Sequence, residues 1–244
     1  MTKVKTLLLT RPEAQSRGLA KDIETHFPEA RCLISPLIEI QLIGSLPDLS
    51  GIAALIFTSV NGVQAYGNLG GPIGMRSYCV GNKTAQAARE IDLEAVSADG
   101  ASANLISLIA SEVAPTGGDL LHIRGEHTTG DIAQILTAKG FGVREAKLYR
   151  QSTVALSEAA KSALAFSSVA VIPIYSPRTA ELLAAEFTAN PDWPRDQITV
   201  VCIGQNAAAA LSGLGFGKIA IADAPNGAAM LAAIAKVLRQ KSLI

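Results

Sequence analysis

Residues 57–62 read Phe-Thr-Ser-Val-Asn-Gly, and residues 174–179 read Ile-Tyr-Ser-Pro-Arg-Thr. In both stretches an apolar run of strand length ends just before a serine, and a helix-forming segment follows. The match extends outward in both directions, with the matching segments in the same order each time. These further pairs are 8–13 with 121–126, 79–85 with 202–208, and 98–101 with 222–228. A repeat this long predicts two similar domains, because solenoid arrays have much shorter periods.

Short apolar runs alternate with amphipathic stretches along the whole chain. Runs that are apolar throughout are typical of parallel strands buried on both faces. The expected strands are 5–9, 53–57, 77–80, 94–96, 119–123, 169–175, 199–203 and 218–221; the expected helices are 14–26, 60–69, 83–91, 103–113, 129–139, 178–187, 206–214 and 228–240. This alternation predicts two α/β lobes, each with a doubly wound parallel sheet.

Two segments depart from this alternation. Residues 32–43 and 146–154 read as extended strands, and each follows the first strand–helix unit of its repeat. They are crossings between lobes if each first unit packs into the lobe that the other repeat completes. A tandem of two complete lobes is the alternative, and the pattern leaves both arrangements open.

The composition excludes several classes of function. The chain balances 21 Lys and Arg against 21 Asp and Glu, whereas a dedicated nucleic-acid binder usually carries a basic excess. Residues 7–9 form too short an apolar run for a signal peptide, and no stretch approaches the roughly 18 apolar residues of a membrane span. We therefore expect a soluble, cytoplasmic protein with neither a nucleic acid nor a membrane as partner.

The cysteines and histidines do not predict a metal site. The three cysteines show no CxxC or Cys/His ligand spacing, so we expect buried, unreactive thiols. The three histidines are scattered along the chain. We expect His26 at the surface end of a helix, His122 in a strand with a structural role, and His127 facing a cleft between the lobes.

The repeated motifs lie where ligands bind in open α/β sheets, at the carboxyl ends of strands. Loops that begin helices there present free backbone N–H groups and the positive end of the helix dipole. Two such loop sets around one cleft predict a small acidic ligand with several carboxylates or phosphates. The candidate binding residues are Arg11, Ser59, Asn61, Gly81, Lys83, Thr84, Arg124, Gly125, Arg150, Ser176, Arg178, Thr179, Gly204 and Asn206. Plain helix capping, or a solvated surface charge, is the alternative for any one of them.

Fingerprints of nucleotide binding and of serine hydrolases are missing. The segment 81–84 resembles the end of a P-loop, but Arg76 stands where that motif needs a glycine. No G-x-S-x-G elbow occurs either. The motifs thus give no indication of a nucleotide cofactor.

Tyr149 is the unusual residue of the second crossing segment, where it precedes Arg150. A phenol has a reference pKa of about 10 and can donate a proton in general acid catalysis. Packing of an amphipathic side chain on a linker strand is the alternative. Tyr149 is therefore the candidate catalytic residue.

Taken together, these segments resemble the uroporphyrinogen-III synthase family over nearly the whole chain. The resemblance includes Thr10-Arg11-Pro12, 57–63, 80–85, Leu148-Tyr149-Arg150, 175–179 and 203–207. Two positions depart from the family pattern. Asn206 stands where the family often has threonine, and residues 151–153 lack the proline that follows the tyrosine segment.

The resemblance implies two flavodoxin-like lobes joined by a two-stranded linker, with an interleaved chain. The lobes would be 1–36 with 151–244, and 37–150, with crossings near 33–43 and 146–154. It also implies a monomeric lyase that uses no cofactor and no metal. The enzyme would cyclise hydroxymethylbilane, a linear tetrapyrrole polycarboxylate, with inversion of the last pyrrole ring and loss of water. Tyr149 matches the family's cleft tyrosine and would assist departure of the substrate hydroxyl.

Two other classes of protein are alternatives to a tetrapyrrole cyclase. A non-catalytic two-lobed module, or an inactive paralogue, would bind a polycarboxylate without any chemistry at Tyr149. A nucleotide-dependent transferase would need a glycine loop or an acidic ribose contact, and the sequence contains neither.

Overall fold

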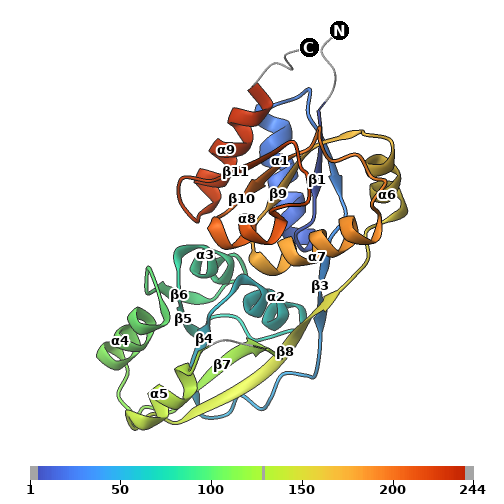
Figure 1. The fold of residues 1–244 in the computed structure, drawn as a ribbon. Helices are drawn as coiled ribbons and strands as arrows, with labels where there is room; N and C mark the ends of the chain where they lie inside the picture. Colours follow the sequence, from blue (N-terminus) through green and yellow to red (C-terminus); the bar gives the residue numbers. More distant parts are fainter. Residues whose placement is uncertain (1–4, 128–129, 240–244) are drawn as a thin grey trace. The chain divides into compact units, whose positions relative to one another are not determined.

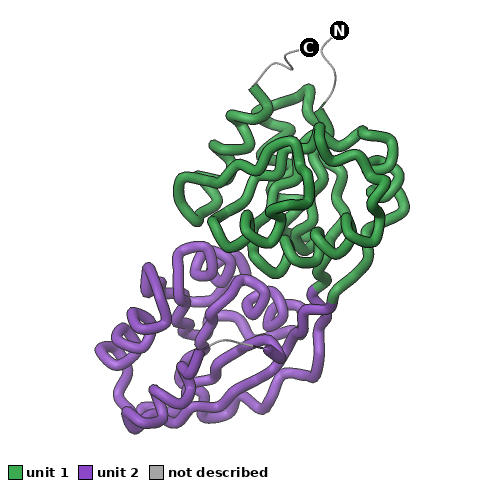
Figure 2. Tube along the Cα trace, in the orientation of Figure 1, with its two compact units in different colours: residues 1–39, 153–244 green, residues 40–152 purple. Residues whose placement is uncertain are grey.

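The computed structural model of the chain describes residues 5–127 and 130–239 (Figure 1). The chain divides into two compact units, residues 1–39 with 153–244 and residues 40–152 (Figure 2). Each unit contains one sheet of mainly parallel strands with helices against it. The prediction of an α/β fold built on parallel sheets is confirmed.

The sheet of the first unit has five strands in the order β11-β10-β9-β1-β2, all paired in parallel. Counted along the chain from β1, this is the flavodoxin-like order 2-1-3-4-5. The strands are β1 (Thr6–Leu9), β2 (Arg31–Ile34), β9 (Val169–Ile174), β10 (Thr199–Cys202) and β11 (Lys218–Ile221). The helices are α1 (Glu13–His26), α6 (Glu158–Ala165), α7 (Pro177–Ala189), α8 (Gln205–Leu211) and α9 (Gly227–Arg239).

The sheet of the second unit has six strands in the order β3-β8-β7-β4-β5-β6. The strands are β3 (Ile38–Leu42), β4 (Ile52–Phe57), β5 (Arg76–Cys79), β6 (Glu94–Ser97), β7 (Asp119–Gly125) and β8 (Val143–Thr153). The helices are α2 (Val60–Asn68), α3 (Asn82–Glu90), α4 (Ser102–Glu112) and α5 (Ile132–Ala138). The strands from β8 to β6 are parallel, and they repeat the order 2-1-3-4-5 when β7 is counted first.

Strand pairing shows that the two sequence repeats are interleaved. In the first unit β1 of the first repeat pairs with β9 of the second, and in the second unit β7 pairs with β4. Each repeat therefore gives its first strand–helix–strand unit to one sheet and its later strands to the other.

The chain passes between the units through β3 and β8, which are hydrogen-bonded neighbours. The backbone N–H of Ile43 donates to the carbonyl of Leu148, and that of Val154 donates to Leu37. Position 37 is thus bonded to 154 and position 43 to 148. Residue numbers rise on one side as they fall on the other, so the two strands run antiparallel.

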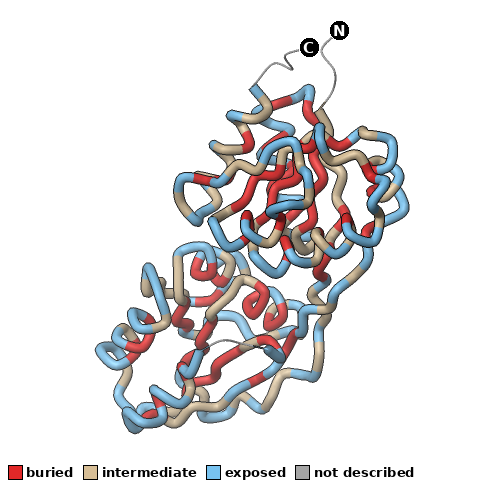
Figure 3. The backbone as a smooth tube through the Cα atoms, in the orientation of Figure 1, coloured by how far each residue is buried: buried red, intermediate tan, exposed pale blue. Residues whose placement is uncertain are grey.

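The central strands of each sheet are buried, as their continuously apolar sequences predict (Figure 3). On β1, Leu8 packs in one cluster with Leu183, whereas Leu7 and Leu9 pack in another with Ile23. This alternation follows from the two-residue period of a strand. Each fully buried leucine or isoleucine contributes about 1.5–3 kcal/mol. The cores thus hold the carboxyl ends of the strands in fixed places.

Two details of the sequence prediction are wrong. Residues 32–43 do not form one extended strand, because the chain leaves β2 after Ile34 and enters β3 only at Ile38. Pro36 lies in this break and has no backbone N–H for a sheet ladder. As a result, β2 belongs to the parallel sheet of the first unit.

The second error is helix α6, which the pattern missed. Its eight residues bury only Ala160 and Leu164, too few for a clear helical period. In the structure Ser157 is the N-cap of this helix, because its Oγ accepts a hydrogen bond from the Ala160 N–H at 3.2 Å. The expected helix 129–139 begins at Ile132 among the described residues, and Thr129 lies outside them.

Candidate active site

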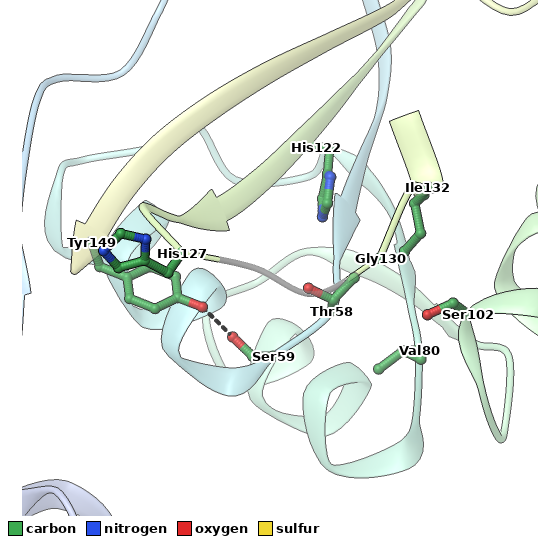
Figure 4. Close-up of a pocket in the computed structure, with 9 residues that line it drawn as sticks. All are labelled: Thr58, Ser59, Val80, Ser102, His122, His127, Gly130, Ile132 and Tyr149. Carbon is green, nitrogen blue, oxygen red and sulfur yellow. Dashed lines mark hydrogen bonds between the residues drawn. The ribbon is translucent and has the colours of Figure 1, made fainter. Parts of the chain in front are cut away.

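Parallel pairing in the second unit places the carboxyl ends of its strands along one edge of the sheet. We call the loops after these strands the carboxyl edge. A cavity of ≈410 Å³ lies there (Figure 4). Its lining residues are Thr58, Ser59, Val80, Ser102, His122, His127, Gly130, Ile132 and Tyr149. This is the position at which open α/β sheets bind ligands.

Ser59 and Tyr149, which are far apart in the sequence, both line the cavity and contact each other. The phenolic oxygen of Tyr149 lies 2.8 Å from Ser59 Oγ, and either atom can donate (Figure 4). Ser59 is the N-cap of α2, and its Oγ accepts from the Gly62 N–H at 3.3 Å. The phenol is therefore linked through one hydroxyl to the positive end of a helix.

Gly125 allows the Tyr149 ring to occupy this place. A Cβ on Gly125 would lie 2.9 Å from Cε2 of Tyr149 and 3.0 Å from Cζ. The neighbouring Glu126 N–H also donates to the Tyr149 carbonyl at 2.8 Å. In the structure Gly125, which the sequence predicts as a binding residue, makes room for the ring of Tyr149. Tyr149 is only 7% exposed.

A polar cluster of His122, Arg124 and Glu145 lies on the neighbouring strands β7 and β8. His122 pairs with Glu145 in register, and its Nδ1 is 3.6 Å from the carboxylate. The guanidinium of Arg124 lies 2.7 Å from the same carboxylate through Nε, and its Nη2 donates at 3.3 Å. Burial lowers the pKa of His122; Glu145 opposes this shift, while Arg124 adds to it. At neutral pH the imidazole is therefore uncharged.

The carboxyl edge of the first unit carries different contacts. The guanidinium of Arg11 stacks over the Tyr175 ring at 4.0 Å and donates to Gln15 at 2.8 Å. Burial lowers the pKa of Arg11 and raises that of Tyr175. Ser176 caps α7 by accepting from the Thr179 N–H at 3.1 Å, and the two hydroxyls lie 2.9 Å apart.

Among the predicted residues, Ser59 and Tyr149 line the cavity. Gly81 and Gly204 are the N-caps of α3 and α8. Of the remaining residues, Asn61 and Thr84 are buried, whereas Lys83, Arg150, Arg178 and Asn206 are exposed. Arg150 is tied to β3, because its Nε donates to the Gln41 side chain at 3.1 Å.

The sequence prediction missed His122 as a cavity residue. His122 occupies the position that Leu9 has in the first repeat, so a polar residue at an apolar strand position was the available signal. His127, which the sequence predicts to face a cleft between the lobes, lines this cavity of the second unit. Thr58 and Ser102 also line it and were not predicted.

Within residues 5–127 and 130–239, no group of three or more His, Cys, Asp or Glu side chains is placed to hold a metal ion. None of the helices in these ranges has the length and apolar character needed to cross a membrane. Cys79 and Cys202 are fully buried, and burial raises the pKa of each thiol to about 11.

The fold and the site define a class: an α/β protein with two flavodoxin-like sheets and a cavity at the carboxyl edge of one of them. A family model described as "Uroporphyrinogen-III synthase HemD" matches residues 18–232. The chain belongs to the uroporphyrinogen-III synthase family, whose members are enzymes of tetrapyrrole biosynthesis. The family resemblance inferred from the sequence is confirmed.

Individual relatives agree with the family match. The chain is 25% identical over 254 residues to the uroporphyrinogen-III synthase of Chlorobaculum parvum, covering 97% of this chain and 100% of the relative. The crystal structure of uroporphyrinogen-III synthetase from Helicobacter pylori 26695 is similar in fold, with a TM-score of 0.60 and 18% identity. That similarity covers 96% of this chain and 100% of the other.

Proposed function

We propose that this protein is a lyase that cyclises hydroxymethylbilane to uroporphyrinogen III. The last pyrrole ring is inverted and water is lost, without a cofactor or a metal ion. The family match over residues 18–232 is the observation that carries this proposal. The cavity at the carboxyl edge supports it, because the substrate bears acetate and propionate groups that suit helix N-termini.

Tyr149 is the proposed proton donor for the departing hydroxyl. The C–O bond breaks with its electron pair on oxygen, the phenol supplies the proton, and water leaves. Electrons from the pyrrole nitrogen form the azafulvene in its cationic form, which keeps the N–H proton, and Tyr149 is left as the phenolate. Ser59 then donates to the phenolate oxygen of Tyr149, since the Gly62 N–H already occupies an acceptor position on Ser59 Oγ. Such a bond to an ionised oxygen is stronger in a buried site.

Ring closure depends on how the bilane is held. Closure without inversion gives the symmetric isomer I, so the protein must favour attack at the other end of the last ring. Holding the reacting carbons in a near-attack geometry can supply much of the required rate advantage. The proposed carboxylate anchors are backbone N–H groups and cations of Arg11, Ser59, Gly81, Lys83, Thr84, Arg124, Ser176, Arg178 and Gly204.

The other expectations fit this role and remain part of the proposal. The protein is proposed to work as a cytoplasmic monomer on one small polycarboxylate, without nucleic acid. A binding module or an inactive paralogue would keep the same edge without turnover, so activity decides between these functions.

The test is a coupled assay. Hydroxymethylbilane is generated in place, the products are oxidised, and the porphyrin isomers are separated. Wild-type protein should give mainly isomer III. Tyr149→Phe should lower kcat about 100-fold, as expected for loss of a general acid, with KM within about two-fold. A folded wild-type protein that gives only isomer I would favour the binding module or the inactive paralogue instead.

A further inference from the structure

His122 is a buried polar side chain that the mechanism above does not use. It is 2% exposed and lies in the wall of the cavity that also holds Tyr149. Its ring extends from β7 toward Thr58 in the view of Figure 4. Neither ring nitrogen has a hydrogen-bond partner among the described residues. A buried polar group left without a partner destabilises a fold, so its presence here calls for a role.

Packing alone does not require an imidazole at this position. The first repeat has Leu9 at the equivalent place, and Leu9 is 1% exposed in β1. Glu145 likewise replaces Ile34, which pairs with Leu9 in the first unit as Glu145 pairs with His122 in the second. The same scaffold therefore accepts two apolar residues where the second unit places a histidine and a carboxylate.

The neighbours of His122 decide which nitrogen carries the proton. The Glu145 carboxylate lies 3.6 Å from Nδ1, so its negative charge favours a proton on that nitrogen. Burial keeps the ring neutral, which leaves a lone pair on Nε2. The cavity wall thus offers a hydrogen-bond acceptor rather than a cation.

The substrate of the proposed function has two kinds of polar group, carboxylates and pyrrole N–H groups. A carboxylate would require an N–H donor or a charged imidazole, whereas a pyrrole N–H needs an acceptor. We infer that His122 is a substrate-positioning residue whose Nε2 accepts a hydrogen bond from a pyrrole N–H beside Tyr149. This inference rests on the proposed function. It gives the site a hydrogen-bond acceptor for a pyrrole N–H of the substrate, in addition to the proposed carboxylate anchors.

Nitrogen NMR tests the inference without relying on turnover. Long-range ¹H–¹⁵N spectra of histidine-labelled protein report the tautomer of each imidazole, and His122→Leu assigns the His122 signal. His122 should show an unprotonated Nε2, and its signal should move when uroporphyrinogen III is added without oxygen. His26, whose Nδ1 lies 2.7 Å from the Asp22 carbonyl on α1, is the internal control. A proton on Nε2, or a signal unmoved by bound product, overturns the inference.

Kinetics with two variants separate positioning from packing. His122→Leu should raise KM about 5- to 10-fold, the effect of one lost neutral hydrogen bond. His122→Gln, whose amide oxygen can accept, should recover most of that loss. The melting temperature of His122→Leu should equal or exceed that of the wild type, which a structural role for His122 would not allow. An unchanged KM in His122→Leu overturns this inference alone, whereas isomer I from the wild type overturns it together with the proposed function.

Discussion

Ser59 in the second unit and Ser176 in the first unit are equivalent N-caps with different hydroxyl partners. Their backbones are nearly identical, with φ and ψ of −152° and 154° for Ser59 and of −158° and 153° for Ser176. Ser176 meets the hydroxyl of Thr179, three residues along its own helix. The equivalent position in the second unit is Gly62, which has no hydroxyl, and there Ser59 meets Tyr149. The cap that has no local hydroxyl partner is therefore the one that contacts a distant phenol.

The same contrast runs through the adjacent strands. The second unit places a histidine and a carboxylate where the first unit has Leu9 and Ile34. The first unit instead stacks Arg11 on Tyr175. The carboxyl edges of the two units therefore differ: the second unit places hydrogen-bonding groups where the first has apolar residues, and the first stacks a partly buried cation on a tyrosine.

The largest effect among variants that test this contrast is expected for Gly125→Ala. Its Cβ would lie 2.9 Å from the Tyr149 ring, which must shift away from Ser59. Small misplacements of a catalytic group can lower rates about 100-fold, and we expect kcat to fall by about 10- to 100-fold. Steady-state assays check this. Gly18→Ala on α1, where a Cβ meets nothing within 4 Å, is the control and should keep its kcat. Normal turnover by Gly125→Ala would show that the ring position is unimportant.

The paired variants Ser59→Ala and Ser176→Ala separate capping from chemistry. Each loses an N-cap worth about 1 kcal/mol, so melting temperatures should fall by similar amounts, about 2–4 °C. Ser59→Ala should in addition lose about ten-fold in kcat beyond any change in Ser176→Ala, because the Tyr149 phenolate loses its donor. Scanning calorimetry and the isomer assay measure the two effects. Equal kcat values in the two variants would contradict the role of Ser59.

The free energy of unfolding should depend on pH differently in the wild type and in His122→Leu, the variant that carries the residue type of the equivalent Leu9. Burial lowers the folded pKa of His122 below its usual 6.5, so the unfolded chain binds a proton that the folded protein does not. The contribution of neutral His122 to the free energy of unfolding is therefore fully present above pH 6.5. It is lost as the pH falls from 6.5 to the lowered pKa of the folded state. From about pH 7.5 to about 5.5 the loss is at most about 1.4 kcal/mol. Urea unfolding of wild type and His122→Leu measures it, and identical pH dependence would exclude a neutral buried His122.

The smallest effect is expected at the matching cysteines, Cys79 and Cys202. Both thiols are buried with pKa values of about 11, so they are protonated and unreactive at neutral pH. Iodoacetamide should label neither in the folded protein, and activity should be retained. Labelling in urea is the control, and mass spectrometry of peptides gives the readout. Unequal labelling of the two would reveal a difference between the cores of the units.

Much of this arrangement follows from local sequence. Apolar runs ending at Phe57 and Ile174, followed by capping serines, predict the strands and helices that the structure contains, because buried strands and helix starts have local chemical signatures. Tyr149 stands out by its residue type and place. Short helix α6 was missed because it buries too few residues to set a helical period. The break at Pro36 was missed because the chain is apolar on both sides of the proline.

The sequence by itself determined the two copies of an α/β unit, and it predicted anion binding at their strand ends and Tyr149 as the candidate acid. Tertiary structure alone decided which strands share a sheet, and so brought Ser59 to Tyr149 across 90 positions of the chain. It also made Gly125 the space for a ring and His122 part of a cavity wall. The physical reason is that periodicity and capping act within a few residues, whereas strand order and side-chain contacts depend on which apolar faces bury one another.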